Sequence, residues 1–204
     1  GNTTNMNEIE SCSSNPNILY VAKDSRKLFR TNNALAENPT WVNLSNNLPF
    51  FQVPVNAIET SSADSNLVYI CFHNDVYRSN DQGLTWSLLS PSLPDISTNT
   101  LLLDTTDAGI EALYVGTDLG VFYRDTTMTD FISFSDGMPY SARVTELEIY
   151  YGNIPQLHRI KASTYGRGLW ESDLYSQQVG NFPSVASVTH AIETNEVFGS
   201  FNVN

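Results

Sequence analysis

Four acidic residues recur at matching places along the chain, and their carboxylates are its best candidates for chemistry. Each follows an aliphatic residue at the same point of a repeated pattern: Glu10, Glu59, Asp104 and Glu148. If the repeats surround one axis, these carboxylates form a ring of negative charge, which can hold a cation or repel anions. The competing interpretation is that each acid lies at an exposed strand end and is only hydrated. The sequence leaves a metal site undecided.

Other catalytic patterns are weak. His73, His158 and His190 are scattered and fit no Ser/His/Asp arrangement, and no cofactor is expected. Cys12 and Cys71 fit no metal-binding spacing, so buried free thiols are expected, with a disulfide as the alternative. Glycoside hydrolysis needs two carboxylates across a cleft. Several carboxylates are candidates for such a pair, but no motif joins them: Asp104, Asp118, Glu146, Glu148 and Asp173.

The elements that must position these acids follow a repeat of 45 residues. Aromatic residues at 41, 86 and 131 and prolines at 49, 94 and 139 are each 45 apart, twice over. A period of this length in a β-rich chain is typical of a propeller, whose unit is a small antiparallel sheet. The repeat divides the chain into units 5–49, 50–94, 95–139 and 140 to about 175.

Each unit carries the signals of four strands. Alternating apolar residues and Asn, Pro, Ser or Gly turns separate the strands, and the third strand has an aromatic at its centre, at Phe29, Tyr77, Tyr123 and Trp170. The sequence predicts an all-β propeller of about four four-stranded antiparallel blades, either complete or part of a larger propeller. The fourth unit lacks the outer-strand pattern. Residues 176–204 are therefore expected to be either a linker or β segment toward a following domain, or a substitute outer strand for this unit.

One turn has a sharp motif. Residues Ser79, Asp81, Gly83, Thr85 and Trp86 match the Ser-x-Asp-x-Gly-x-Thr-Trp pattern of the Asp-box in full. The carboxylate is expected to accept backbone N–H bonds within the turn, the glycine to adopt a conformation closed to other residues, and the tryptophan to anchor the hairpin. We therefore expect the Asp-box to have a structural role. The other units lack the motif, as at 31–33 and 125–127.

With this box, the tracts 114–122 and 164–172 make the chain resemble the Asp-box propellers, also called bacterial neuraminidase repeat proteins. This family includes sortilin-type receptors, xyloglucanase-type glycoside hydrolases and secreted bacterial surface proteins. The tract 164–174 looks most like the last propeller repeat of large secreted Bacteroidetes proteins, where an Ig-like or PKD-type domain often follows. The resemblance covers about residues 1–175 and implies the fold rather than an activity.

Turns between the second and third strands are candidate binding loops. They carry Tyr165, Arg167, Asp118 and His73, and recognition residues are often placed on loops that a rigid sheet supports. The alternative at 165–168 is simply a tight turn of the last repeat.

Charge limits the class of partner. The net charge of −12 disfavours nucleic acid and anionic membranes, since both attract Lys and Arg. No apolar run is long enough to span a bilayer.

The sequence predicts a non-catalytic binding or scaffold module, secreted or on the cell surface, with any signal peptide outside this sequence. The expected ligand is a protein or a polysaccharide, with further domains in the same polypeptide. The alternative is part of a xyloglucanase-like glycoside hydrolase whose catalytic acids lie elsewhere.

Overall fold

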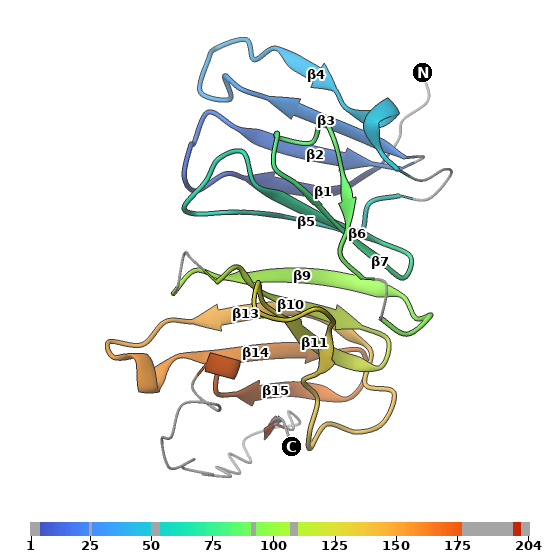
Figure 1. The fold of residues 1–204 in the computed structure, drawn as a ribbon, viewed down its shortest axis with the longest axis vertical. Helices are drawn as coiled ribbons and strands as arrows, with labels where there is room; N and C mark the ends of the chain where they lie inside the picture. Colours follow the sequence, from blue (N-terminus) through green and yellow to red (C-terminus); the bar gives the residue numbers. More distant parts are fainter. Residues whose placement is uncertain are drawn as a thin grey trace.

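In the computed structural model the regular secondary structure is almost entirely β-strand (Figure 1). It describes residues 5–24, 26–49, 54–90, 93–106, 110–176 and 198–200. Within these ranges the strands form four sheets of four strands each, which confirms the predicted all-β class and the four-stranded unit. No helix in these ranges is both long and apolar enough to cross a membrane.

The sheets are called blades 1 to 4 in chain order. Blade 1 contains β1 Met6–Ser11, β2 Leu19–Lys23, β3 Lys27–Thr31 and β4 Trp41–Asn43. Blade 2 contains β5 Ala57–Thr60, β6 Val68–Phe72, β7 Asp75–Ser79 and β8 Ser87–Leu88. Blade 3 contains β9 Thr98–Asp104, β10 Ala112–Thr117, β11 Gly120–Arg124 and β12 Ile132–Ser133. Blade 4 contains β13 Val144–Tyr150, β14 Arg159–Thr164, β15 Gly168–Ser172 and β16 Phe198–Ser200. Short 3-10 turns occur at Ser45–Asn47 and Pro155–Leu157.

Each of the first three blades is an antiparallel meander in chain order. The inner strands β1, β5, β9 and β13 contact one another in this sequence. In Figure 1 they lie in the middle of the molecule, while β4 and β15 lie toward opposite ends. The inner strands therefore share the centre, and the outer strands radiate from it.

Blade 4 is completed differently. Its outer strand β16 pairs with β15 in parallel, with Trp170 opposite Gly199. A parallel pair needs a long crossover connection rather than a hairpin. The expected linker or β segment at 176–204 thus includes a strand at 198–200, while 177–197 and 201–204 lie outside the described residues.

Apolar clusters hold consecutive blades together, because each blade buries both faces only by packing on its neighbours. Between blades 1 and 2 the cluster includes Tyr20, Leu28, Ile58 and Ile70. Between blades 2 and 3 it includes Tyr69, Cys71, Leu101 and Val115. Between blades 3 and 4 it includes Tyr114, Tyr123, Leu147 and Ile160. Among the described residues, no such cluster joins blade 4 to blade 1.

The Asp-box turn docks blade 2 onto blade 1. Asp81 accepts bonds from the Ser79 hydroxyl (2.7 Å) and from both the backbone N–H (2.8 Å) and the hydroxyl (2.7 Å) of Thr85. Gly83 has φ +86°, and a Cβ there would lie 3.0 Å from the Leu44 side chain. Trp86 packs against the cluster between blades 1 and 2. These contacts support a structural role for the box.

Blade 1 keeps a variant of the same turn, although the sequence pattern predicts its loss. Asn33 takes the place of the aspartate: it accepts bonds from the Thr31 hydroxyl (2.8 Å) and from the backbone N–H of Thr40 (2.9 Å). Trp41 follows directly. An insertion of three residues between Asn33 and Thr40, relative to Asp81 and Thr85, hides the motif from a fixed-spacing search.

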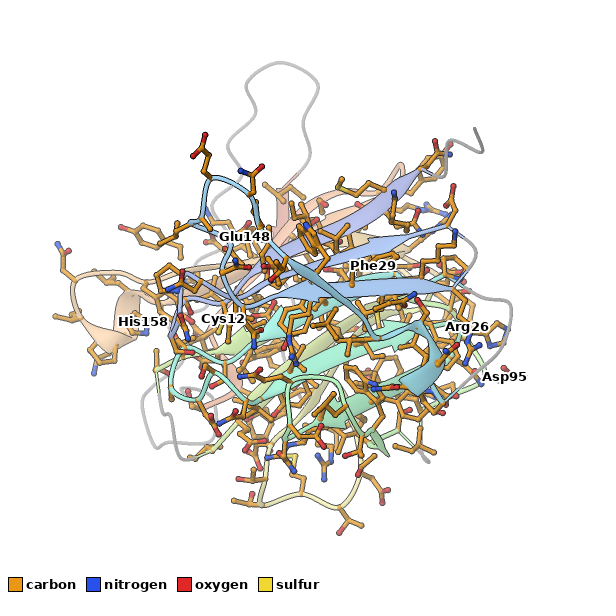
Figure 2. All side chains as sticks on the ribbon, turned by 90° about the horizontal axis from the view of Figure 1, so that it is seen from above. Cys12, Arg26, Phe29, Asp95, Glu148 and His158 are labelled. Carbon is orange, nitrogen blue, oxygen red and sulfur yellow. The ribbon has the colours of Figure 1, made fainter. Side chains whose placement is uncertain are left out.

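Both cysteines, Cys12 and Cys71, are buried free thiols. Figure 2 shows how densely side chains fill the space between the sheets. Burial raises the pKa of the Cys71 thiol to about 12, so it stays protonated and unreactive at neutral pH.

Candidate functional site

The inner strands of all four blades line one polar cavity of about 300 Å³. Five carboxylates surround it, at Glu8, Glu10, Glu59, Glu146 and Glu148. The neutral polar side chains at its wall are Asn56, Asn99, Thr100 and Thr145. Among the described residues, no lysine or arginine lines it. The cavity is therefore acidic, and a cation or a hydrogen-bond donor is its natural occupant.

Three of the carboxylates connect neighbouring blades. Glu10 of β1 accepts a bond from the Thr60 hydroxyl of β5 at 2.8 Å. Glu59 of β5 accepts a bond from the backbone N–H of Leu103 in β9 at 3.2 Å. Glu146 of β13 accepts a bond from the Thr100 hydroxyl at 3.4 Å. These bonds fix the carboxylates in place, so the cavity is preformed.

Burial and mutual repulsion favour protons on the inner carboxyls. Burial, together with a smaller contribution from the nearby charge of Glu10, raises the pKa of Glu59 to about 8. The pKa values of Glu8 and Glu10 are also raised, mainly by burial. Glu59 therefore carries a proton at neutral pH, while a bound cation would favour its ionised form.

The structure places three of the four predicted ring residues in this cavity and the fourth outside it. Asp104 is buried at the end of β9, where it accepts bonds from the Thr106 hydroxyl (2.8 Å) and the Tyr151 hydroxyl (3.3 Å). Side chains alternate along a strand, so Leu102 and Asp104 lie on the same face of β9. It is Leu102, two residues before Asp104, that lines the cavity. The strand has seven residues, and a repeat alignment does not show which of them reaches the cavity.

Sequence reasoning did not assign two of the wall residues to the ring, although it named Glu146 as a candidate for a hydrolytic pair. Glu8 and Glu146 each lie two residues before a predicted ring residue, on the same face of the strand. Strand alternation applied outward from Glu10 and Glu148 would have identified both. No comparable sequence signal marks Asn56 and Asn99.

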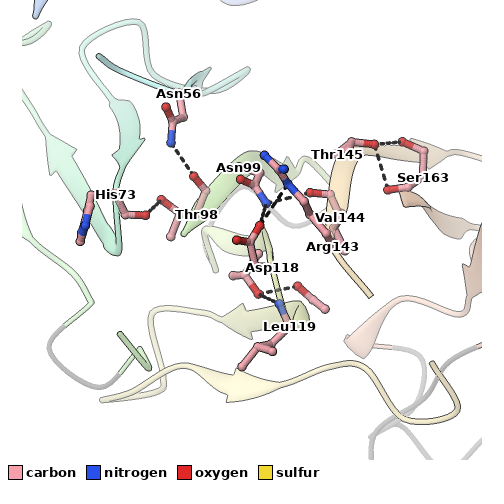
Figure 3. Close-up of polar contacts among 12 residues, drawn as sticks. Asn56, His73, Thr98, Asn99, Asp118, Leu119, Arg143, Val144, Thr145 and Ser163 are labelled. Carbon is pink, nitrogen blue, oxygen red and sulfur yellow. Dashed lines mark hydrogen bonds and ion pairs between the residues drawn. The ribbon is translucent and has the colours of Figure 1, made fainter. Parts of the chain in front are cut away.

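Two of the predicted binding loops are used in contacts between blades (Figure 3). Asp118 forms an ion pair with Arg143 at 3.2 Å and accepts a bond from the Asn99 amide at 2.9 Å. The backbone carbonyl of His73 accepts a bond from the Thr98 hydroxyl at 3.0 Å. These residues tie blades 2, 3 and 4 together at one end of the cavity.

The other two predicted loop residues project into solvent. Tyr165 is 77% exposed and Arg167 is also exposed, on the turn between β14 and β15. Gly166 at the tip has φ +72°, and a Cβ there would have no neighbouring atom within 4 Å. The structure thus brings no joint site together from the four predicted loop residues.

No cluster of His, Cys, Asp or Glu in the described part of the chain has the geometry to hold a metal ion. The carboxylates that line the cavity therefore form no metal-binding cluster among these residues.

No protein-family model matches the chain, and no curated protein matches it. Solved structures do match. An ancestral GH74 enzyme aligns with a TM-score of 0.65 and 16% identity, over 82% of this chain and 25% of that one. The GH74 xyloglucanase from Xanthomonas campestris aligns with a TM-score of 0.59 and 14% identity, over 89% of this chain and 31% of that one.

A third similar structure, YCF48 bound to D1 peptide, aligns with a TM-score of 0.54 and 14% identity, over 79% of this chain and 48% of that one. At such identities the similarity shows the fold alone, and it confirms the predicted β-propeller. The chain spans between a quarter and a half of the length of these proteins. No family model supports membership of the Asp-box family itself.

Proposed function

We propose that this chain is a non-catalytic binding module, and that its acidic cavity receives a cationic group of a protein partner, such as a lysine side chain. The observation that carries the proposal is the cavity itself, with its five glutamates and no basic residue at the wall. An ammonium group donates three hydrogen bonds, and the carboxylates and amide oxygens around it can accept them.

The exposure of two of the carboxylates supports a role in recognition. Glu146 and Glu148 are exposed, so they add negative charge at the opening of the cavity without contributing a core. Negative potential at an opening attracts a cationic partner before contact and raises its association rate. A secreted or surface location suits such a module, and the similar fold of YCF48 bound to D1 peptide supports a peptide as the ligand to test.

Calorimetric titration with a tetralysine peptide tests this function. We expect saturable binding that weakens at least tenfold in the double variant Glu146→Gln/Glu148→Gln, and no binding of the same peptide with acetylated side chains. The matched control is Glu37→Gln/Asp130→Asn, which removes two exposed carboxylates outside the cavity. Equal loss in both double variants would mean that overall charge, not the cavity, attracts the peptide.

A second function is favoured by one specific observation. Glu59 has a pKa raised to about 8 and lies beside Glu10, whose charge contributes to that shift. Glycoside hydrolysis uses a carboxyl that stays protonated at neutral pH, together with a second carboxyl group nearby. In this alternative Glu59 is the general acid, and the similarity to GH74 folds gives the substrate class to test.

Incubation with xyloglucan and other β-glucans separates the two functions. The binding module releases no reducing sugar, whereas the hydrolase releases sugar at a rate that falls at least a hundredfold in Glu59→Gln. Hydrolysis by the unmodified chain would reject the non-catalytic proposal.

A further inference from the structure

Each blade after the first buries one row of three side chains against the blade before it. The row runs across the inner, second and third strands, at positions paired in register. In blade 2 it is Ile58, Ile70 and Tyr77. In blade 3 it is Leu101, Val115 and Phe122. In blade 4 it is Leu147, Ala162 and Trp170. The pattern is aliphatic, aliphatic, aromatic in every case, and each row belongs to an apolar cluster between two blades.

Blade 1 has the same row, although no described blade precedes it. Ile9 pairs with Val21, and Val21 pairs with Phe29, so all three side chains lie on one face of the sheet. Phe29 is labelled on this blade in Figure 2. None of the three belongs to the apolar clusters of the described residues. Val21 in the middle of the row is only 9% exposed and Phe29 is partly buried, whereas Ile9 on the inner strand is 54% exposed.

The outer strand continues this free apolar face. Trp41 of blade 1 corresponds in the repeat to Trp86 and Phe131. Trp86 packs into the cluster between blades 1 and 2, and Phe131 is only 7% exposed within the cluster between blades 2 and 3. Trp41 is 45% exposed. The free apolar face is thus defined by Ile9, Val21, Phe29 and Trp41.

The opposite end of the array has no such face. Blade 4 turns toward solvent a row formed by Glu148, Lys161 and Glu171. Lys161 and Glu171 lie 3.6 Å apart and Lys161 also lies over the Tyr150 ring, while Arg159 and Asp173 form a second ion pair at 2.7 Å. In repeat arrays a polar outer face is what a terminal repeat needs to remain soluble. This polar end face meets that need, and the free apolar face does not.

We infer that the free apolar face is an interface for one further propeller blade, which precedes residue 5 in the polypeptide. Three successive interfaces establish the geometry, and the fourth would repeat it with a row of the same residue classes. The incoming blade would present what blade 1 presents to blade 2, namely Tyr20, Ala22 and Leu28 on its facing side. This inference does not depend on the function proposed for the cavity.

The experiment adds such a blade to the N-terminal side of blade 1. A second copy of residues 5–53 placed directly ahead of residue 5 keeps the spacing that separates Ile9 from Ile58. Ile9→Cys reports on the face, because Cys12 and Cys71 are buried. We expect a thiol reagent to label position 9 rapidly in the 204-residue chain and at least tenfold more slowly in the extended chain. Glu171→Cys on the polar end face is the matched control, and its labelling should not change.

A further variant shows whether the protection comes from packing. Tyr20→Lys in the added copy alone places a charge in the middle of the new interface, and it should restore rapid labelling at position 9. Unchanged labelling of position 9 in the extended chain, whether or not the added copy folds, would overturn the inference. So would labelling that slows with rising concentration of the 204-residue chain, because a second copy would then be the occupant.

Discussion

The two outer faces of the blade array differ in chemistry although they belong to blades of the same design. The face of blade 1 is apolar at Ile9 and Trp41, which are 54% and 45% exposed, while blade 4 ends in charged residues joined by ion pairs. Both sheets have four strands, and in both the first three form an antiparallel meander. The difference therefore does not arise from the fold of a blade but from what each face must contact.

One repeat thus serves two roles. An apolar row stabilises the protein only where another blade removes it from water, at roughly 25 cal/mol per Å² of buried apolar surface. The same row on a free face contributes little and risks association. Matched substitutions at equivalent positions inside and at the end of the array can therefore measure the contribution of the neighbouring blade.

The largest expected difference is between Ile58→Lys and Ile9→Lys. Ile58 is buried between blades 1 and 2, so a charge there should lower the free energy of unfolding by about 4 kcal/mol or prevent folding. The same change at exposed Ile9 should cost under about 1 kcal/mol. Urea unfolding of both variants measures the difference, and similar losses would mean that the face of blade 1 is already covered.

The tryptophans give a smaller contrast. Trp86→Ala removes packing from the cluster between blades 1 and 2, and we expect a loss of about 3 kcal/mol. Trp41→Ala should cost about 1 kcal/mol or less, because the ring belongs to none of the apolar clusters and is largely exposed. Thermal unfolding of the two variants side by side is the measurement. A larger loss for Trp41→Ala would reverse the comparison.

The central cavity should make stability depend on pH. Because the pKa of Glu59 is raised to about 8, the folded state binds its proton more tightly than the unfolded state. This contribution is complete below about pH 4.5 and is lost as the pH rises through 8. We expect stability to fall by about 2 kcal/mol between about pH 5 and pH 9, given about 1.4 kcal/mol per pKa unit and some solvent screening.

The variant Glu59→Gln checks the origin of that slope. It should remove most of the dependence between about pH 5 and pH 9, with Glu37→Gln on an exposed loop as the matched control. A slope that persists unchanged in Glu59→Gln would assign the pH dependence to other groups.

The smallest effect is expected at the polar end face. Lys161→Met breaks the partly exposed ion pair with Glu171, and such pairs contribute under about 1 kcal/mol. The variant should also make this face more like the free apolar face, so light scattering at high concentration is the more sensitive measurement. Association of the variant but not of the original chain would show that the charges keep this end soluble.

The sequence was sufficient for the parts of the fold that repeat, because the 45-residue spacing and the third-strand aromatics depend on local patterns. It predicted Glu10, Glu59 and Glu148 at the cavity for the same reason. It misplaced Asp104, because repeat alignment does not determine how far β9 extends past the centre. The sequence could not predict the burial of individual side chains. Trp41 and Trp86 stand in similar motifs, and only the presence of a packed neighbour distinguishes them.

The turn of blade 1 shows a second limit of prediction from sequence motifs. Asn33 replaces an aspartate and three inserted residues lengthen the loop, yet the hydrogen bonds to Thr31 and Thr40 are retained. A fixed motif finds only the unmodified spacing. The raised pKa of Glu59 is likewise a property of assembly, since its neighbours come from other blades.

Proton release during binding tests the central claim, that the acidic cavity receives a cationic group. A cation next to Glu59 favours its ionised form, so tetralysine binding near neutral pH should release a proton, which calorimetry detects by comparing buffers of different ionisation enthalpy. We expect close to one proton released by the unmodified chain and a much smaller release by Glu59→Gln at similar affinity. Binding with no proton release in the unmodified chain, or the same release in both, would contradict a cationic group in this cavity.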